Sequence, residues 1–247
     1  MDDKRLAEVV KHIDQFQESC DEFLSPLCNP CNKKVLIIGS GWGTEVAWLL
    51  KQGAKEIVGI DPAPRPTNPL NKYIAEKNLQ GTYKITRGTV DDITEEYSEH
   101  FDLIISHNVF EHIMNLEETF KAIPKLLNKK GRVAIFTAPL FFSSCGSHLN
   151  IKPWEHLWGN LDDIKSKVPP FKWSDYTTGM NKMTLTSFLE CVINSGAIVT
   201  KLYTRPDRNI QEFPKYIDKI LLKNKISLFD LTVEGISIEF FYHVDKN

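Results

Sequence analysis

The sequence predicts an α/β fold in which helices cover both faces of a mostly parallel sheet. Three short apolar runs, at 35–38, 56–60 and 101–106, have the length and β-branched composition of buried strands. The first two are separated by a segment with helical spacing, and a second such segment follows the last run. This order indicates parallel strands, because a crossover between parallel strands normally contains a helix.

The first strand, Val35–Ile38, runs directly into a glycine-rich turn and a helix. Apolar residues recur at helical spacing from Thr44 to Gln52, and Gly53 is placed to end that helix. The next strand, 56–60, ends at Asp61, whose carboxylate can accept both hydroxyls of a ribose. The turn contains Gly39, Gly41 and Gly43, which let the backbone approach a ligand closely.

The spacing of these glycines separates two kinds of nucleotide cofactor. A dinucleotide fingerprint is Gly-x-Gly-x-x-Gly, and its last glycine allows a helix to pack close to the pyrophosphate. Here the third glycine is Gly43 and Thr44 stands at the next position, so the pattern disfavours a nicotinamide cofactor.

The same alternation continues towards the middle of the chain. The segment 101–113 is a strand followed by a turn, and a helix is expected from Leu116 to Leu127. A turn at Asn128–Gly131 leads into a strand over 132–139, which ends in a proline that cannot continue it.

These motifs, in this order from about residue 34 to 200, resemble the class I S-adenosylmethionine-dependent methyltransferases of the type 11 kind. The resemblance implies a three-layer Rossmann-like sandwich with a seven-stranded, mostly parallel sheet, an antiparallel last strand, and an insert after the fifth strand that caps the site. It also implies S-adenosyl-L-methionine as the cofactor. The residues that match the family's cofactor positions are Gly39, Ser40, Gly41, Trp42, Gly43, Asp61, Pro62, Val90, Asp91, Ser106 and His107.

Two positions depart from that family pattern. Many members carry an acid inside the first strand that helps to hold the methionine amino group, and this chain has Ile37 there. The family often has an acid that reaches the adenine amino group at the position of Thr89. We expect Asp91, Asp92 or backbone groups near Val90 to substitute for the second acid.

We expect a single methyltransferase domain over 1–247, with an N-terminal helical segment at 1–30 and two inserts, at 140–182 and 205–230. Residues 4–24 have the spacing of an amphipathic helix, and a further helix is expected at 183–196 with Ser187 and Glu190 as a capping box. The last two strands are expected at 197–203 and 233–242.

The first insert contains the candidate catalytic groups. It follows the fifth strand at the carboxyl edge of the sheet, where α/β proteins bind ligands, and has no regular period. His148 or His156 could remove a proton from an acceptor hydroxyl, because an imidazole titrates near neutral pH. His107 and Asn108, just after the strand at 101–106, are the second choice, and we interpret Glu111 and His112 as mainly structural.

Composition restricts the partners. A net charge of −2 argues against a nucleic-acid binder, which would carry a basic surplus. No apolar segment reaches membrane-spanning length and the N-terminus lacks a signal-peptide core, so we expect a cytoplasmic protein with no membrane partner. Cys28 and Cys31 have no second pair at zinc-ligand spacing, and no carboxylate and histidine group has such spacing either, so we expect no metal.

The expected activity is methyl transfer from S-adenosylmethionine to a small molecule, with oxygen as the preferred acceptor atom. The segments around Gly146–His148, Pro153–His156 and Gly179–Thr184 are similar to those of bacterial methyltransferases of cell-surface carbohydrate synthesis. That similarity implies a sugar, or a nucleotide-linked or phosphorylated metabolite, as acceptor. An N-methyltransferase, an aminopropyl transferase, a nicotinamide oxidoreductase and a non-catalytic cofactor-binding protein stay open as alternatives, as does a homodimeric state.

Overall fold

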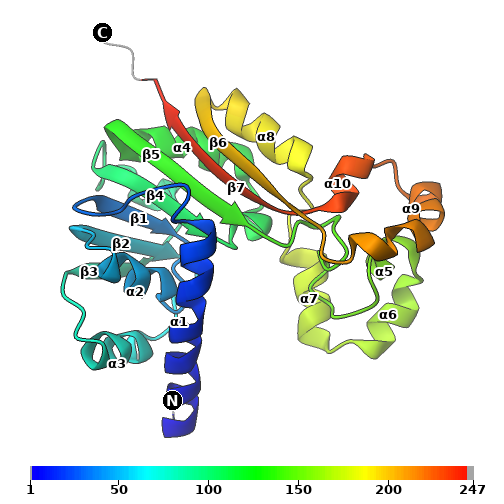
Figure 1. Cartoon of the computed structure of the whole chain (residues 1–247), viewed down its shortest axis with the longest axis horizontal. Coiled ribbons are helices and arrows are strands. Elements are labelled where there is room, and N and C mark those ends of the chain that lie inside the picture. The colour runs from blue at the N-terminus through cyan, green and yellow to red at the C-terminus, as the bar shows by residue number, and fades with distance from the viewer. Residues whose placement is uncertain (1, 244–247) are drawn as a thin grey trace.

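The computed structural model describes residues 2–243 and has a seven-stranded sheet with helices on both faces (Figure 1). The strand order is β3-β2-β1-β4-β5-β7-β6. β7 runs antiparallel to both neighbours and the other pairs are parallel, so the predicted fold class is confirmed. The strands are β1 (Lys34–Ile38), β2 (Glu56–Asp61), β3 (Tyr83–Arg87), β4 (Phe101–His107), β5 (Leu127–Thr137), β6 (Ala197–Pro206) and β7 (Val233–Tyr242).

Three helices cover one face of the sheet, and two cover the other. α1 (Asp3–Phe23), α2 (Thr44–Lys51) and α3 (Asn68–Glu76) pack on the face that carries Ile37. α4 (Leu116–Leu126) and α8 (Leu185–Asn194) pack on the opposite face, which carries Leu36. Successive side chains of β1 therefore enter separate cores, which explains why every residue of the predicted strand 35–38 is buried.

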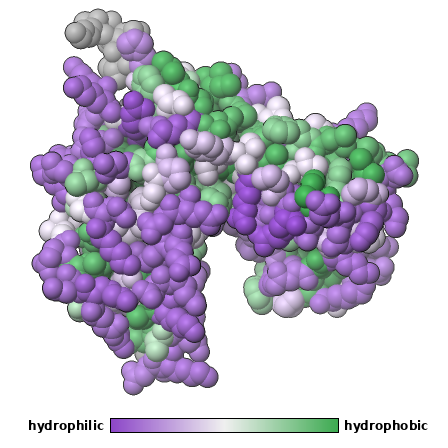
Figure 2. All heavy atoms as spheres, viewed as in Figure 1, coloured by the Kyte–Doolittle hydropathy of each residue, from purple (hydrophilic) through white to green (hydrophobic). Residues whose placement is uncertain are grey.

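The two predicted inserts, 140–182 and 205–230, form one unit that we call the cap, at the right of Figure 1. Trp154 from the first insert packs against Phe213 from the second, with ring centroids 5.1 Å apart, and its indole N–H donates to the carbonyl of Leu231. Figure 2 shows a hollow between the cap and the side of the molecule formed by α1 and α3. The elements of the cap are α5 (Glu155–Trp158), α6 (Leu161–Lys167), α7 (Pro170–Thr178), η3 (Ile210–Lys215), α9 (Ile217–Lys223) and α10 (Leu228–Thr232).

Two local predictions are wrong. Residues 128–131 belong to β5 and do not form a separate turn; the pairing with β4 jumps instead, from Leu127 opposite Phe101 to Arg132 opposite Leu103. The cap of α8 is formed by Thr184 and Ser187, whose side chains and backbone N–H groups bond reciprocally, and not by Ser187 and Glu190. A serine hydroxyl can take the part that Glu usually has in this motif because it both donates and accepts.

Within residues 2–243, no helix is long and apolar enough to cross a membrane.

Candidate active site

The glycine turn between β1 and α2 is held against the end of β2. The backbone N–H groups of Gly39 and Ser40 both donate to the carbonyl of Ile60, at 2.9 Å. A Cβ on Gly39 would lie 2.3 Å from a methyl carbon of Val109, and φ there is +80°. Only glycine meets both conditions, so the tight turn that the sequence predicts is required sterically.

Asp61 ends β2 and ties the glycine turn to the following loop. Its carboxylate accepts the backbone N–H of Gly41 at 2.9 Å on one oxygen and that of Ala63 at 2.8 Å on the other. Each carboxylate oxygen has a second lone pair, so two further hydrogen bonds can be accepted in an orientation that the backbone has already set.

A cavity of about 540 Å³ lies where β1, β2 and β4 end. Its volume is in the range of small-molecule and cofactor sites. The buried Asn108 Oδ1 has no hydrogen-bond partner within the described residues, so a ligand donor could satisfy it. Six of the predicted site residues line this cavity: Gly39, Asp61, Pro62, Val90, Asp91 and Asn108.

The other predicted cofactor residues, Ser40, Gly41, Trp42, Gly43, Ser106 and His107, do not line the cavity. The Ser106 hydroxyl donates to the carbonyl of Ile38 on the neighbouring strand. His107 is the next residue of β4, so its side chain points to the other face of the sheet from that of Ser106 and lies beneath α1. There its ring nitrogens are 3.1 Å from Ser19 Oγ and 3.6 Å from the buried carboxylate of Glu45.

The two departures from the family pattern have different structural outcomes. Ile37 is fully buried among apolar side chains, so the first strand offers no polar group at that position. Asp92 accepts the backbone N–H and the hydroxyl of Thr89, which lowers the pKa of the Asp92 carboxyl. Asp91 lines the cavity, and among residues 2–243 its carboxylate has no hydrogen bond of the kind that Asp92 makes with Thr89, so of the two it is the better candidate to replace the missing acid.

His112 lines the cavity, although its sequence position led us to interpret it as mainly structural. It lies in the 3-10 turn η2 (Phe110–His112), not in the following helix, and it lines the cavity together with Asn108, four residues earlier. Glu111 is buried beside it, and burial raises the pKa of its carboxyl. The spacing of Asn108 and His112 directly after β4 was the available signal, since the carboxyl ends of parallel strands bind ligands.

The structure separates the two histidines of the first insert. His148 lies next to His112, with ring centroids 5.4 Å apart, and burial lowers its pKa, which favours the neutral imidazole. His156 is buried inside the cap, where its Nε2–H donates to the carbonyl of Phe141 at 2.8 Å. Burial lowers the pKa of His156 to about 4. Of this pair, His148 is the one next to a cavity-lining residue.

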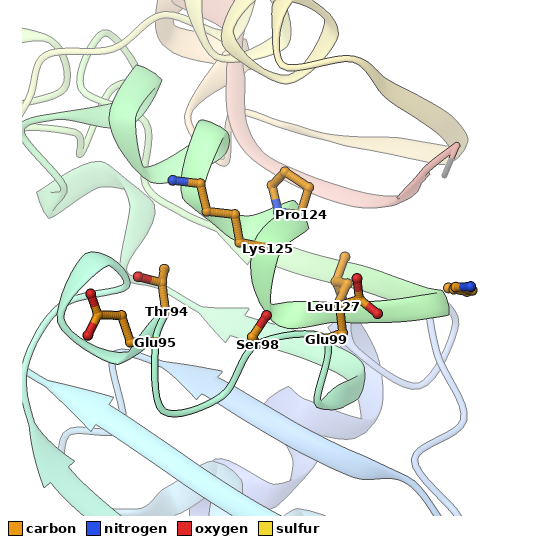
Figure 3. A pocket seen from close by; sticks show the side chains of 8 residues that line it. Thr94, Glu95, Ser98, Glu99, Pro124, Lys125 and Leu127 are labelled. Atoms are coloured by element: carbon orange, nitrogen blue, oxygen red, sulfur yellow. The ribbon is translucent and has the colours of Figure 1, made fainter. Parts of the chain in front are cut away.

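A second cavity, of about 610 Å³, lies between α4 and the loop that precedes β4 (Figure 3). It is at the amino end of β4, away from the glycine turn and Asp61. Ligands of α/β sheets bind at the carboxyl ends of strands, so the smaller cavity beside Asp61 is the candidate active site. The side chains that line the second cavity are Thr94, Glu95, Ser98, Glu99, Pro124, Lys125, Leu127 and Lys129.

The fold has three layers, a sheet with helices on both faces, and its cavity lies between a glycine turn and an acid at the end of β2. These features define the class of α/β enzymes that bind a nucleotide cofactor. Residues 12–201 match the family described as "Methyltransferase domain". The chain belongs to this family and is an S-adenosylmethionine-dependent methyltransferase.

Individual relatives agree with that assignment. The chain is 25% identical over 183 residues to a ubiquinone biosynthesis O-methyltransferase of Neisseria meningitidis, an alignment that covers 68% of this chain and 72% of that protein. It is 27% identical over 137 residues to the protein of the same name from Proteus mirabilis, covering 56% of this chain but only 51% of the relative. An S-adenosylmethionine-dependent methyltransferase from Mesorhizobium loti has the same fold, with a TM-score of 0.57 at 14% identity over 92% of this chain and 99% of the other.

Proposed function

We propose that the protein transfers the methyl group of S-adenosylmethionine to a hydroxyl oxygen of a small molecule. The observation that carries this proposal is the pair His112 and His148, whose imidazoles lie together at the edge of the cofactor cavity. The names of the relatives, which are O-methyltransferases, support oxygen as the receiving atom.

The reaction requires that one bond forms, one bond breaks and one proton leaves. The acceptor oxygen forms a bond to the methyl carbon as the bond from that carbon to sulfur breaks, and the electron pair of the broken bond stays on sulfur. The hydroxyl proton leaves at or after transfer, so groups that orient the hydroxyl and favour its deprotonation accelerate the reaction. Asp61 and the glycine turn hold the cofactor, and the imidazoles of His112 and His148 lie where the hydroxyl would be oriented.

Two acceptor classes are supported by different observations. The relatives' names point to a hydroxylated intermediate of ubiquinone biosynthesis. The second candidate is a sugar, or a nucleotide-linked or phosphorylated metabolite, which is the acceptor class implied by the similarity of Gly146–His148, Pro153–His156 and Gly179–Thr184 to methyltransferases of cell-surface carbohydrate synthesis.

A transfer assay with product analysis tests this function. The purified chain is incubated with S-adenosylmethionine and either hydroxylated ubiquinone precursors or nucleotide sugars, and the products are examined for an added methyl group on oxygen. O-methylation of either class supports the proposal and selects the acceptor. Transfer to nitrogen alone would establish the N-methyltransferase alternative, and cofactor binding without any transfer would favour the non-catalytic one.

A variant pair tests the assignment of the two histidines. His148→Ala is expected to lower turnover at least tenfold with little change in affinity for S-adenosylmethionine, because its side chain lies beside His112 and not at Asp61. His156→Gln keeps a donor for Phe141 and is expected to retain turnover. If His156→Gln loses turnover in a folded protein and His148→Ala does not, the roles are reversed.

A further inference from the structure

Three side chains with metal-binding groups meet beside the cofactor cavity. One ligand atom from each of Glu111, His112 and His148 lies within 4.8 Å of the other two. Glu111 and His112 come from the turn after β4, and His148 comes from the first insert. The sequence shows no metal-ligand spacing here because the third member is 36 positions further along the chain.

Hydrogen bonds from outside the cluster leave the ligand atoms of Glu111 and His112 free. The Nδ1–H of His112 donates to the carbonyl of Gly179 at 2.7 Å, so its Nε2 carries a lone pair. The hydroxyl of Thr137 donates to Glu111 Oε2, which leaves Oε1 available. Metal-binding histidines almost always donate their other ring N–H to a carbonyl or carboxylate, and metal-binding carboxylates are hydrogen-bonded in turn.

Asn181 holds the turn that carries these two ligands. Its side-chain amide donates to the carbonyls of Phe110 and Ile113, at 2.6 and 2.8 Å, and its backbone N–H donates to the carbonyl of Glu111 at 3.0 Å. A ligand set supported in this way loses little conformational entropy when it binds. Asn181 and Gly179, which accepts the hydrogen bond from His112, both lie near the end of the first insert, so this segment holds the turn in place.

The third member, His148, has an unused ligand atom. Its Nε2 is buried and has no hydrogen-bond partner in the described part of the chain. A buried ring nitrogen without a partner is rare, because desolvation without a hydrogen bond costs free energy. A metal ion between His148 and His112 would satisfy it.

We propose that Glu111, His112 and His148 bind a divalent metal ion at the edge of the cofactor cavity. Two imidazoles and one carboxylate favour a first-row transition metal such as Mn²⁺ or Zn²⁺ over Mg²⁺. Ligand-to-metal distances of about 2.1 Å place two ligand atoms at most about 4.2 Å apart, so any separation near the 4.8 Å limit of this cluster must shorten when the ion binds. His148 lies in a segment without helix or strand, which can make that adjustment.

This inference rests on the proposed O-methyl transfer and adds a way to bind its acceptor. Three protein ligands leave coordination positions open, and His112 lines the cavity that contains Asp61. An acceptor hydroxyl in an open position would have a lowered pKa and would lie next to the cofactor. Its proton would then leave to water, and His148 would act as a ligand, not as the base.

A second group of potential ligands, Cys20, Glu45 and His107, does not have these properties. All three side chains are buried where α1, which carries Cys20, packs on α2 and β4, and burial raises the pKa of the Cys20 thiol, which keeps it protonated. His107 already has contacts on both ring nitrogens, with Ser19 Oγ and Cys20 Sγ. We interpret this group as internal packing.

Metal titration of the full chain tests the proposal without any methyl transfer. Protein treated with a chelator and then freed of it is titrated with Mn²⁺ and separately with Zn²⁺, and uptake is followed by calorimetry. We expect one ion per chain, and at least tenfold weaker binding in His148→Ala and in Glu111→Gln. Glu111→Gln keeps an oxygen that can accept from Thr137. The exposed His12 on α1 supplies the matched control, His12→Ala, which should bind as the wild type does.

Circular dichroism and affinity for S-adenosylmethionine show whether each variant is folded. The proposal is overturned if the wild type takes up neither ion, or if folded His148→Ala binds metal as tightly as the wild type. Absence of uptake by the wild type overturns the proposal even if both variants fail to fold. Methyl transfer without metal uptake would overturn this inference alone, whereas metal uptake without transfer to any acceptor would overturn the proposed function alone.

Discussion

Asp61 links the glycine turn to the cofactor cavity through a single carboxylate. The sequence was sufficient to predict this residue, because a strand that ends in an acid after a glycine turn is a local pattern. The sequence could not show that Asp61 also accepts the backbone N–H of Gly41, since that contact depends on how the turn folds back.

Replacement of that carboxylate should weaken cofactor binding. Asp61→Asn is expected to lower affinity for S-adenosylmethionine about tenfold or more, since one of two charged acceptors becomes a donor and about 1.4 kcal/mol corresponds to each factor of ten. Calorimetry measures the change, and Asp162→Asn on the exposed surface of α6 is the matched control. Equal affinities for the two variants would show that Asp61 does not hold the cofactor.

The environment of His156 could not be predicted from the sequence. The sequence made His156 a candidate for removing a proton from an acceptor hydroxyl, but the side chain is buried in the cap and bonded to the carbonyl of Phe141. Burial is a property of tertiary packing, and the irregular sequence of the insert has no period from which it could be inferred.

The buried imidazole of His156 predicts a pH dependence of stability. Its folded-state pKa of about 4 is below the unfolded value of about 6.5, so the unfolded state binds the proton more readily. Its stabilising contribution is therefore complete above pH 6.5 and is lost as pH falls towards 4, by about 3 kcal/mol in all.

Urea unfolding of wild type and His156→Gln across that range measures this effect. The difference in free energy of unfolding between the two proteins should shrink as pH falls from 6.5 to 4, because glutamine does not titrate. A difference that stays constant over this range would contradict the assignment of His156 as a neutral, buried group.

At the scale of elements, the sequence predicted the strands of the sheet except β3 and the helices that flank it except α3, whereas it did not predict the helices of the cap. β1, β2, β4 and β7 are buried on both faces or read as continuous apolar runs, which are strong local signals. The cap instead takes its core from two segments, and its short helices have few turns over which a period could show.

The packing of the cap can be tested at its largest buried side chain. Trp154→Ala should cost about 3–5 kcal/mol of cap stability, because a fully buried ring that contacts Phe213 is removed. Limited proteolysis should then cut within the cap at lower denaturant concentration, while affinity for S-adenosylmethionine changes little, since the cofactor residues lie on the sheet. Phe171→Ala, at a side chain 71% exposed, is the control and should leave the cleavage pattern unchanged.

At the scale of the whole molecule, the sheet forms the candidate cofactor cavity, and under the proposed function the first insert contributes to the acceptor side. The carboxyl ends of β1, β2 and β4 bring the glycine turn, Asp61 and Asn108 to one cavity, although these residues span about 70 positions of the chain. Parallel strands make this arrangement predictable from order alone. The meeting of His112 with His148 was not predictable, because it depends on the path of the first insert over the sheet.

The proposed function depends most directly on the cofactor that this cavity binds. Calorimetric titration of the wild-type chain with S-adenosylmethionine, compared with NADH under the same conditions, tests it in one experiment. The glycine spacing, Asp61 and the family assignment predict saturable binding of S-adenosylmethionine at one site per chain and no comparable binding of NADH. Failure to bind S-adenosylmethionine, or a clear preference for NADH, would contradict it.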